Sequence, residues 1–105
     1  MLDIRADAQV QTVICTFDVT PGTAQDVLEA LHDAYAQVIS RQPGFIGAAM
    51  HLNDAQTRIA TYSRWNARGD YQAMLRTPEM RERNRAIHGM CRSFEPVMYE
   101  VAAVF

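Results

Sequence analysis

The sequence predicts an α+β domain of the ferredoxin-like class, a split β-α-β arrangement with an antiparallel sheet. Segments with the two-residue period of strands alternate with segments of helical spacing, in the order β-α-β-β-α-β. Turn residues separate these segments. The chain of 105 residues has the length of one domain and contains no linker-like stretch. We therefore divide it into an N-terminal arm, residues 1–9, and a single domain, residues 10–105.

The first strand is predicted over residues 10–19, VQTVICTFDV, where every second residue is apolar. The sequence TPG ends this strand, and Thr20 or Thr23 can cap the helix that follows. Apolar residues then recur at three- to four-residue spacing until Pro43-Gly44, which indicates one apolar helix face. This face consists of Val27, Leu28, Leu31, Ala34, Tyr35 and Val38.

A hairpin is predicted next, from residues 45–52, FIGAAMHL, and residues 58–65, RIATYSRW. The polar sequence NDAQT between them is typical of a turn. A short helix, DYQAML, is expected to follow.

The last part of the chain is predicted as a long helix and a final strand. Thr77 can cap the helix, and Pro78 suits its first position. We expect this helix to continue to about Ser93, with Met80, Asn84, Ile87 and Cys91 on one face. Pro96 interrupts the chain, so the final strand is expected over residues 97–105, VMYEVAAVF.

Two of the predicted strand segments, FIGAAM and VAAVF, are apolar at every position. An antiparallel sheet with helices on one face normally has polar residues on the open face. Both faces are therefore expected to be buried, and a second copy of the sheet is the simplest cover. We predict a homodimer in which two sheets form a barrel-like core.

Composition excludes several classes of protein. The net charge of −2 argues against binding to nucleic acid or a membrane surface. The N-terminus does not have the pattern of a signal peptide, and no apolar run approaches the about 20 residues of a membrane span. Cys15 and Cys91 alone make no metal site, and no other metal-ligand spacing occurs. We expect a cytoplasmic protein with free thiols and no bound metal.

Several stretches resemble the antibiotic biosynthesis monooxygenase (ABM) family of dimeric α+β barrels. They are Pro21-Gly22, QPGFIGA at residues 42–48, RIATYSRW ending in Trp65, and DYQAMLRTPEM from Asp70. The resemblance implies a cofactor-free monooxygenase that oxidises a polycyclic aromatic anthrone or phenol with dioxygen, in aromatic polyketide tailoring. It also implies a pocket between the sheet and the helices of each protomer.

The resemblance further implies which residues act. The family has a Trp at the end of the third strand, a Tyr six residues later, and an Arg in the long helix. At the position four residues before the Trp, where the family has Asn, this chain has Thr. Indole, phenol and guanidinium groups are donors that can stabilise an oxyanion, and a hydroxyl can replace part of the Asn. The candidate catalytic residues are Trp65, Arg85, Tyr71 and Thr61.

Strand geometry adds candidates for substrate binding. Alternate side chains share one face, so Thr61, Ser63 and Trp65 are expected to project together. A small polar residue such as Ser63 suits a ligand-filled pocket. His51 on the second strand is an outside candidate for an acid-base group. The candidate substrate-binding residues are Ser63, Tyr35, Phe17 and His51.

Structural roles are the alternative for each candidate. Trp65 could fill the core or an interface, and Arg85 could lie on a solvated helix face with Arg81 and His88. Haem-degrading relatives of this fold need a His in the short helix after the Trp, and DYQAMLRTPEM has none, so haem is disfavoured.

Three functions stay open: the monooxygenase, a polyketide cyclase or isomerase using the same pocket, and a non-catalytic small-molecule-binding dimer.

Overall fold

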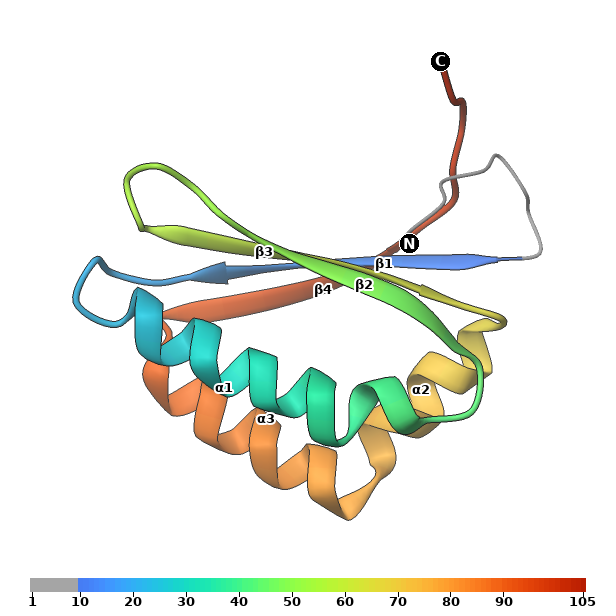
Figure 1. Cartoon of the computed structure of the whole chain (residues 1–105), viewed down its shortest axis with the longest axis horizontal. Helices are drawn as coiled ribbons and strands as arrows, with labels where there is room; N and C mark the ends of the chain where they lie inside the picture. Colours follow the sequence, from blue (N-terminus) through green and yellow to red (C-terminus); the bar gives the residue numbers. More distant parts are fainter. Residues whose placement is uncertain (1–9) are drawn as a thin grey trace.

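A computed structural model describes residues 10–105, so the predicted arm at residues 1–9 lies outside the described residues. The described chain forms a four-stranded sheet with helices on one of its faces (Figure 1). The elements are β1 (Gln11–Asp18), α1 (Ala24–Gln37), the 3-10 helix η1 (Ile39–Arg41), β2 (Phe45–Leu52), β3 (Arg58–Trp65), α2 (Arg68–Arg76), α3 (Pro78–Met90) and β4 (Ser93–Tyr99).

The strand order is β2-β3-β1-β4, and each neighbouring pair is antiparallel. This order confirms the predicted ferredoxin-like α+β fold. Asn53 closes the β2–β3 hairpin, because its Oδ1 accepts hydrogen bonds from the backbone N–H groups of Thr57 and Arg58 at 2.9 and 2.8 Å. The predicted start of α3 is also confirmed. Thr77 Oγ1 accepts from the backbone N–H of Met80 at 3.2 Å, and Pro78 takes the first helical position.

The core lies between the sheet and the helices and has two parts. One surrounds Trp65, and the other surrounds Ile59, and both of these side chains are fully buried. Strand alternation supplies the sheet side of both parts, because Val13, Cys15 and Phe17 face the helices from β1. Helices α1 and α3 lie side by side beneath the sheet (Figure 1).

The predicted boundaries of the last helix and the last strand are wrong. Helix α3 ends at Met90, and β4 begins at Ser93 and ends at Tyr99, so the strand contains Pro96. The expectation that Pro96 breaks the chain fails because β4 is an edge strand, which pairs with β1 alone among the described strands. A proline is tolerated there when its missing N–H would face away from the neighbouring strand. Residues 100–105 lie beyond the sheet.

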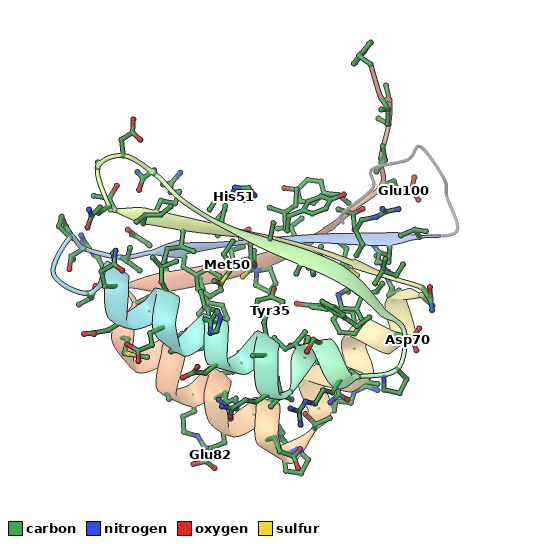
Figure 2. The ribbon with its side chains drawn as sticks, in the orientation of Figure 1. Tyr35, Met50, His51, Asp70, Glu82 and Glu100 are labelled. Carbon is green, nitrogen blue, oxygen red and sulfur yellow. The ribbon has the colours of Figure 1, made fainter. Side chains whose placement is uncertain are left out.

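The other face of the sheet is free of helices in the described part of the chain (Figure 1). Apolar side chains cross its centre in register, with Ile14 opposite Tyr62 on one side and Val97 on the other. His51 also lies on this face (Figure 2). Within residues 10–105, three buried polar atoms have no hydrogen-bond partner, namely Thr12 Oγ1, Tyr62 OH and Arg64 Nε. The register places all three residues on this open face.

Candidate functional site

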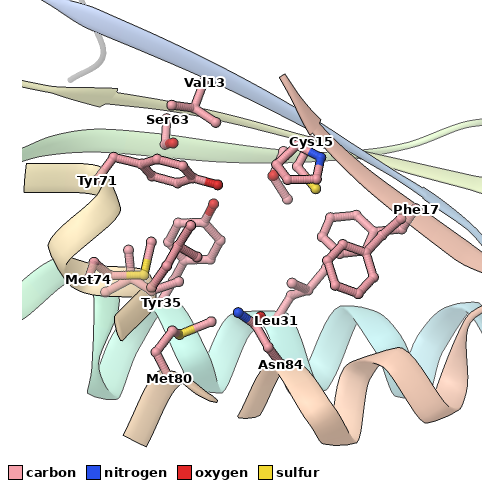
Figure 3. Close-up of a pocket in the computed structure, with 15 residues that line it drawn as sticks. Val13, Cys15, Phe17, Leu31, Tyr35, Ser63, Tyr71, Met74, Met80 and Asn84 are labelled. Atoms are coloured by element: carbon pink, nitrogen blue, oxygen red, sulfur yellow. The ribbon is translucent and has the colours of Figure 1, made fainter. Parts of the chain in front are cut away.

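A cavity of about 60 Å³ lies between the inner face of the sheet and the three helices (Figure 3). Strands β1, β3 and β4 and helices α1, α2 and α3 all contribute to its walls. Most of the lining is apolar, including Val13, Leu31 and the two methionines Met74 and Met80. The polar side chains in the lining are Cys15, Tyr35, Thr61, Ser63, Tyr71 and Asn84. A few polar groups on apolar walls are typical of a small-molecule site.

Two tyrosines from different helices meet in this cavity. Tyr35 comes from α1 and Tyr71 from the first turn of α2, and their hydroxyl groups point toward each other (Figure 3). Burial raises the pKa of Tyr71 to about 12. Burial also raises the pKa of Tyr35, although a hydrogen bond with Thr61 partly offsets this effect. Both phenols are therefore neutral near pH 7 and can donate hydrogen bonds.

Trp65 lies one layer behind the cavity and does not line it. Its side chain is 0% exposed and makes edge-to-face contacts with Phe45 and Tyr71, at centroid distances of 5.3 and 5.8 Å. The indole Nε1–H donates to Ser63 Oγ at 3.1 Å. The predicted common face of Thr61, Ser63 and Trp65 is confirmed, but the indole reaches the cavity only through Ser63.

Asn84 is the polar cavity residue to which the sequence interpretation assigned no function. Met80 and Asn84 lie four residues apart on one face of α3, and both line the cavity. The sequence did contain a sign that Asn84 belongs to a site, because its amide lies on the apolar helix face defined by Met80 and Ile87. A structural helix face would more often be apolar at this position.

The structure does not bring Arg85 to the cavity. One residue after Asn84, the helix has turned by roughly 100°, and the Arg85 side chain is exposed and absent from the cavity lining. His51 is likewise exposed, because it alternates along β2 with Met50 and Leu52, which face the helices (Figure 2). Neither residue is brought to the cavity.

The remaining predicted residues do line the cavity. Phe17 stacks on Phe94 at a centroid distance of 5.5 Å and forms one wall. The predicted residues in contact with the cavity are Phe17, Tyr35, Thr61, Ser63 and Tyr71. The structure thus brings together five of the eight predicted side chains, adds Asn84, and places Trp65 behind them.

The cysteines and acidic residues do not form a further reactive centre in the described chain. Cys15 and Cys91 are free thiols, and burial raises the pKa of Cys15 to about 12, so its thiol is neutral near pH 7. Among residues 10–105, no three His, Cys, Asp or Glu side chains are grouped so as to hold a metal ion. In the same part of the chain, no helix is long and apolar enough to cross a membrane.

The fold and the cavity define a small α+β domain with an internal cavity whose walls are mostly apolar and carry a few polar groups. Comparison with known proteins gives the family. The model of the antibiotic biosynthesis monooxygenase (ABM) family matches residues 10–86, and the chain belongs to this family. The resemblance predicted from the sequence is confirmed.

Relatives with named activities cover nearly all of the chain. Tetracenomycin-F1 monooxygenase of Streptomyces glaucescens is 25% identical over 108 residues, which is 100% of this chain and 93% of that protein. The monooxygenase ActVA-Orf6 of Streptomyces coelicolor, solved with nanaomycin D, has a TM-score of 0.82 at 21% identity and covers 94% of each chain. A variant of SnoaB, a cofactor-independent oxygenase of Streptomyces nogalater, has a TM-score of 0.81 at 17% identity, covering 92% and 97%.

Proposed function

We propose that this protein is a cofactor-independent monooxygenase that oxidises a polycyclic aromatic anthrone or phenol with dioxygen, as a step in aromatic polyketide tailoring. The observation that carries the proposal is the pair of neutral phenols, Tyr35 and Tyr71, that meet within apolar walls. Membership of the family and the named activities of its relatives support the same reaction class.

The proposed chemistry begins with the substrate. An anthrone loses a proton from its central ring carbon, and the negative charge spreads to its oxygen. The resulting electron-rich anion supplies the electrons that reduce dioxygen. One oxygen atom becomes the new carbonyl, and the other leaves as water together with the proton released first and the second hydrogen of the ring carbon. Hydrogen bonds from Tyr35 and Tyr71 to the substrate oxygen stabilise the anion more than the neutral substrate, and this difference accelerates the reaction.

The cavity is suited to stabilising an anion and poorly suited to removing a proton with a strong base. Among the described residues, its lining contains no carboxylate, imidazole or guanidinium group. The Asn84 amide offers both a donor and an acceptor, so we propose that it takes over part of the role of the family Asn, for which this chain has Thr61. The two side chains approach the cavity from opposite layers, Asn84 from α3 and Thr61 from β3.

Oxygen uptake with the anthrone dithranol tests the proposal on metal-free protein. We expect uptake above the uncatalysed rate, and we expect Tyr71→Phe to reduce it by about tenfold, since one hydrogen bond to a charged group contributes about 1.5 kcal/mol or more. Arg85→Ala, which removes a large exposed side chain, is the matched control and should keep full activity. Uptake equal to the uncatalysed rate would refute the oxygenase and leave a cyclase, an isomerase or a binding protein.

We also propose that two copies associate through the open faces of their sheets. The apolar row through Ile14, Tyr62 and Val97 supports a covered face. Light scattering should give twice the chain mass of 11.8 kDa. Tyr62→Glu should shift the mass toward that of one chain, because it places a charge in the proposed interface. A wild-type mass near 11.8 kDa would contradict the dimer.

A further inference from the structure

A second, larger space lies at the surface beside the cavity. It is a groove of about 360 Å³ between α1 and β2, open to solvent. Tyr35 and Ala36 line it from α1, and Phe45, Ala48 and Met50 line it from β2. Figure 2 shows Tyr35 and Met50 pointing toward each other across the gap between these two elements.

Tyr35 lies between the two spaces, since it is the one side chain among residues 10–105 that lines both of them. The inner cavity, about 60 Å³, has room for a few water molecules and not for a fused three-ring molecule. Sites that hold drug-sized molecules have volumes of about 300–1,000 Å³. A fused aromatic ligand with one ring in the cavity must therefore extend past Tyr35.

We propose that the α1–β2 groove is a distal subsite that holds the outer rings of a fused aromatic substrate, while the reacting ring occupies the inner cavity. This inference rests on the proposed function and adds the place and size of the ligand. Because Tyr35 lines both spaces, this binding mode requires its side chain to move when the ligand binds. The Tyr35 and Phe45 rings, tilted at a centroid distance of 6.5 Å, offer faces and edges for aromatic contact.

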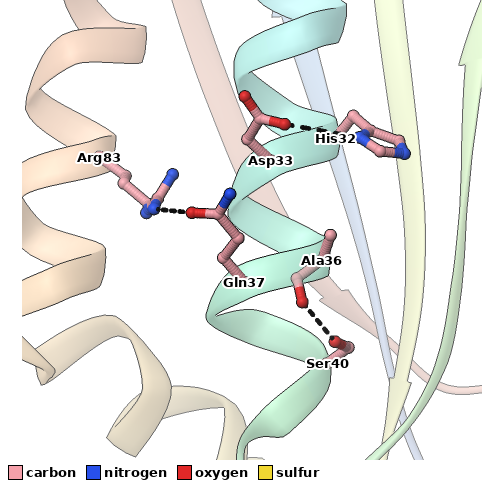
Figure 4. Close-up of polar contacts among 6 residues, drawn as sticks. All are labelled: His32, Asp33, Ala36, Gln37, Ser40 and Arg83. Atoms are coloured by element: carbon pink, nitrogen blue, oxygen red, sulfur yellow. Dashed lines mark hydrogen bonds and ion pairs between the residues drawn. The ribbon is translucent and has the colours of Figure 1, made fainter.

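The rest of the groove fits the same class of ligand. Ala48 leaves its floor flat, and Met50 is a flexible apolar side chain that adapts to ring shape. His32 and Ser40 stand at the exposed rim, where hydroxyl or carbonyl substituents of the outer ring would meet polar groups. The opposite side of α1 is attached to α3, because Arg83 Nη2 donates to Gln37 Oε1 at 2.6 Å (Figure 4).

Filling the groove from its surface tests the proposal. Ala36 is exposed and lines the groove but not the inner cavity, so Ala36→Trp fills the groove with little effect on folding. Ala86→Trp is the matched control, because Ala86 is an exposed alanine on α3 that lines neither space. Thermal unfolding should be similar for both variants and the wild type.

The measurement is calorimetric titration with danthron, the quinone counterpart of dithranol, which binds without consuming oxygen. We expect the wild type and Ala86→Trp to bind equally, and Ala36→Trp to bind at least tenfold more weakly. Equal binding by Ala36→Trp and the wild type, or no binding by the wild type, would overturn the subsite. Oxygen uptake is measured separately. If Ala36→Trp weakens danthron binding but the wild type shows no oxygen uptake, the subsite stands and the oxygenase is refuted. If the wild type takes up oxygen but Ala36→Trp binds danthron as well as the wild type does, the oxygenase stands and the subsite is refuted.

Discussion

The hydrogen bond between Trp65 and Ser63 predicts a measurable link between the core and the cavity. Trp65→Phe removes the indole N–H that donates to Ser63 Oγ at 3.1 Å and leaves a void in a site that is 0% exposed. The lost ring costs about 1–2 kcal/mol and the lost hydrogen bond about 1 kcal/mol of unfolding free energy. We expect a total of about 2–3 kcal/mol, or a fall in Tm of roughly 10–20 °C for a domain of this size.

Turnover separates this link from a general loss of stability. If the indole orients the Ser63 hydroxyl toward the substrate, losing that orientation costs about 1 kcal/mol, a roughly fivefold fall in kcat/KM for dithranol oxidation. Ser63→Ala should cause a similar fall, and the double variant should be no worse than either single one. Ile87→Ala is the control, because Ile87 is buried in the other part of the core and does not line the cavity.

The reasoning would be refuted by either of two results. Additive losses from Trp65→Phe and Ser63→Ala would show that the two groups act independently. A fall in kcat/KM for Ile87→Ala equal to that for Trp65→Phe, at equal loss of Tm, would show that the indole only fills space. Both measurements are made well below the Tm of every variant, so that all of the protein is folded.

Three further predictions concern charge and position. Burial raises the pKa of Cys15 from 9.0 and the pKa of Tyr71 from 10.0, both to about 12, in the folded chain. The stability that these two neutral side chains contribute is therefore complete below about pH 9 and is lost as the pH rises toward 12. Urea unfolding should show a fall of about 1.4 kcal/mol per pH unit for each such group, and Cys15→Ala should make the fall less steep. Asn84→Ala should lower kcat/KM by about fivefold, whereas Arg85→Ala should leave it unchanged; the opposite ranking would contradict the placement of the two side chains. The pH midpoint of turnover should move with the acidity of the anthrone used, and a midpoint common to two anthrones of different acidity would indicate a titrating protein group.

Most of the fold follows from local patterns in the sequence. The apolar stripe of α1 and the Thr77-Pro78 cap of α3 are local features, and each predicts its element without knowledge of the rest. The end of the chain needed non-local information. Pro96 is compatible with a strand only because β4 is at the sheet edge, and the position of a strand within a sheet is not written in its own residues.

The sequence could predict which side chains of a strand share a face, because they alternate along the strand. It could not predict which side chains of a helix face the cavity, because that depends on how the helix packs. Along β3, a period of two places Thr61 and Ser63 on the same face of the sheet, and the structure shows that this face is the cavity side. On α3, a one-residue difference rotates a side chain by roughly 100°, so the choice between Asn84 and Arg85 depends on where the helix packs. Trp65 lies behind the cavity lining because it packs against Phe45 and Tyr71, and only the tertiary structure reveals these contacts.

The presence of Asn84 in the cavity lining, in place of the expected Arg85, changes which substrates the site can bind. A guanidinium in the cavity would carry a full positive charge and favour substrates that arrive already ionised. In the described part of the chain, the lining residues are all neutral near pH 7, among them the phenols of Tyr35 and Tyr71 and the amide of Asn84. Neutral donors in a mostly apolar cavity favour an anion that forms inside it, since an anion entering from water would lose its hydration without meeting a charge. The arrangement therefore suits a neutral substrate that is acidic enough to ionise after binding, as an anthrone is.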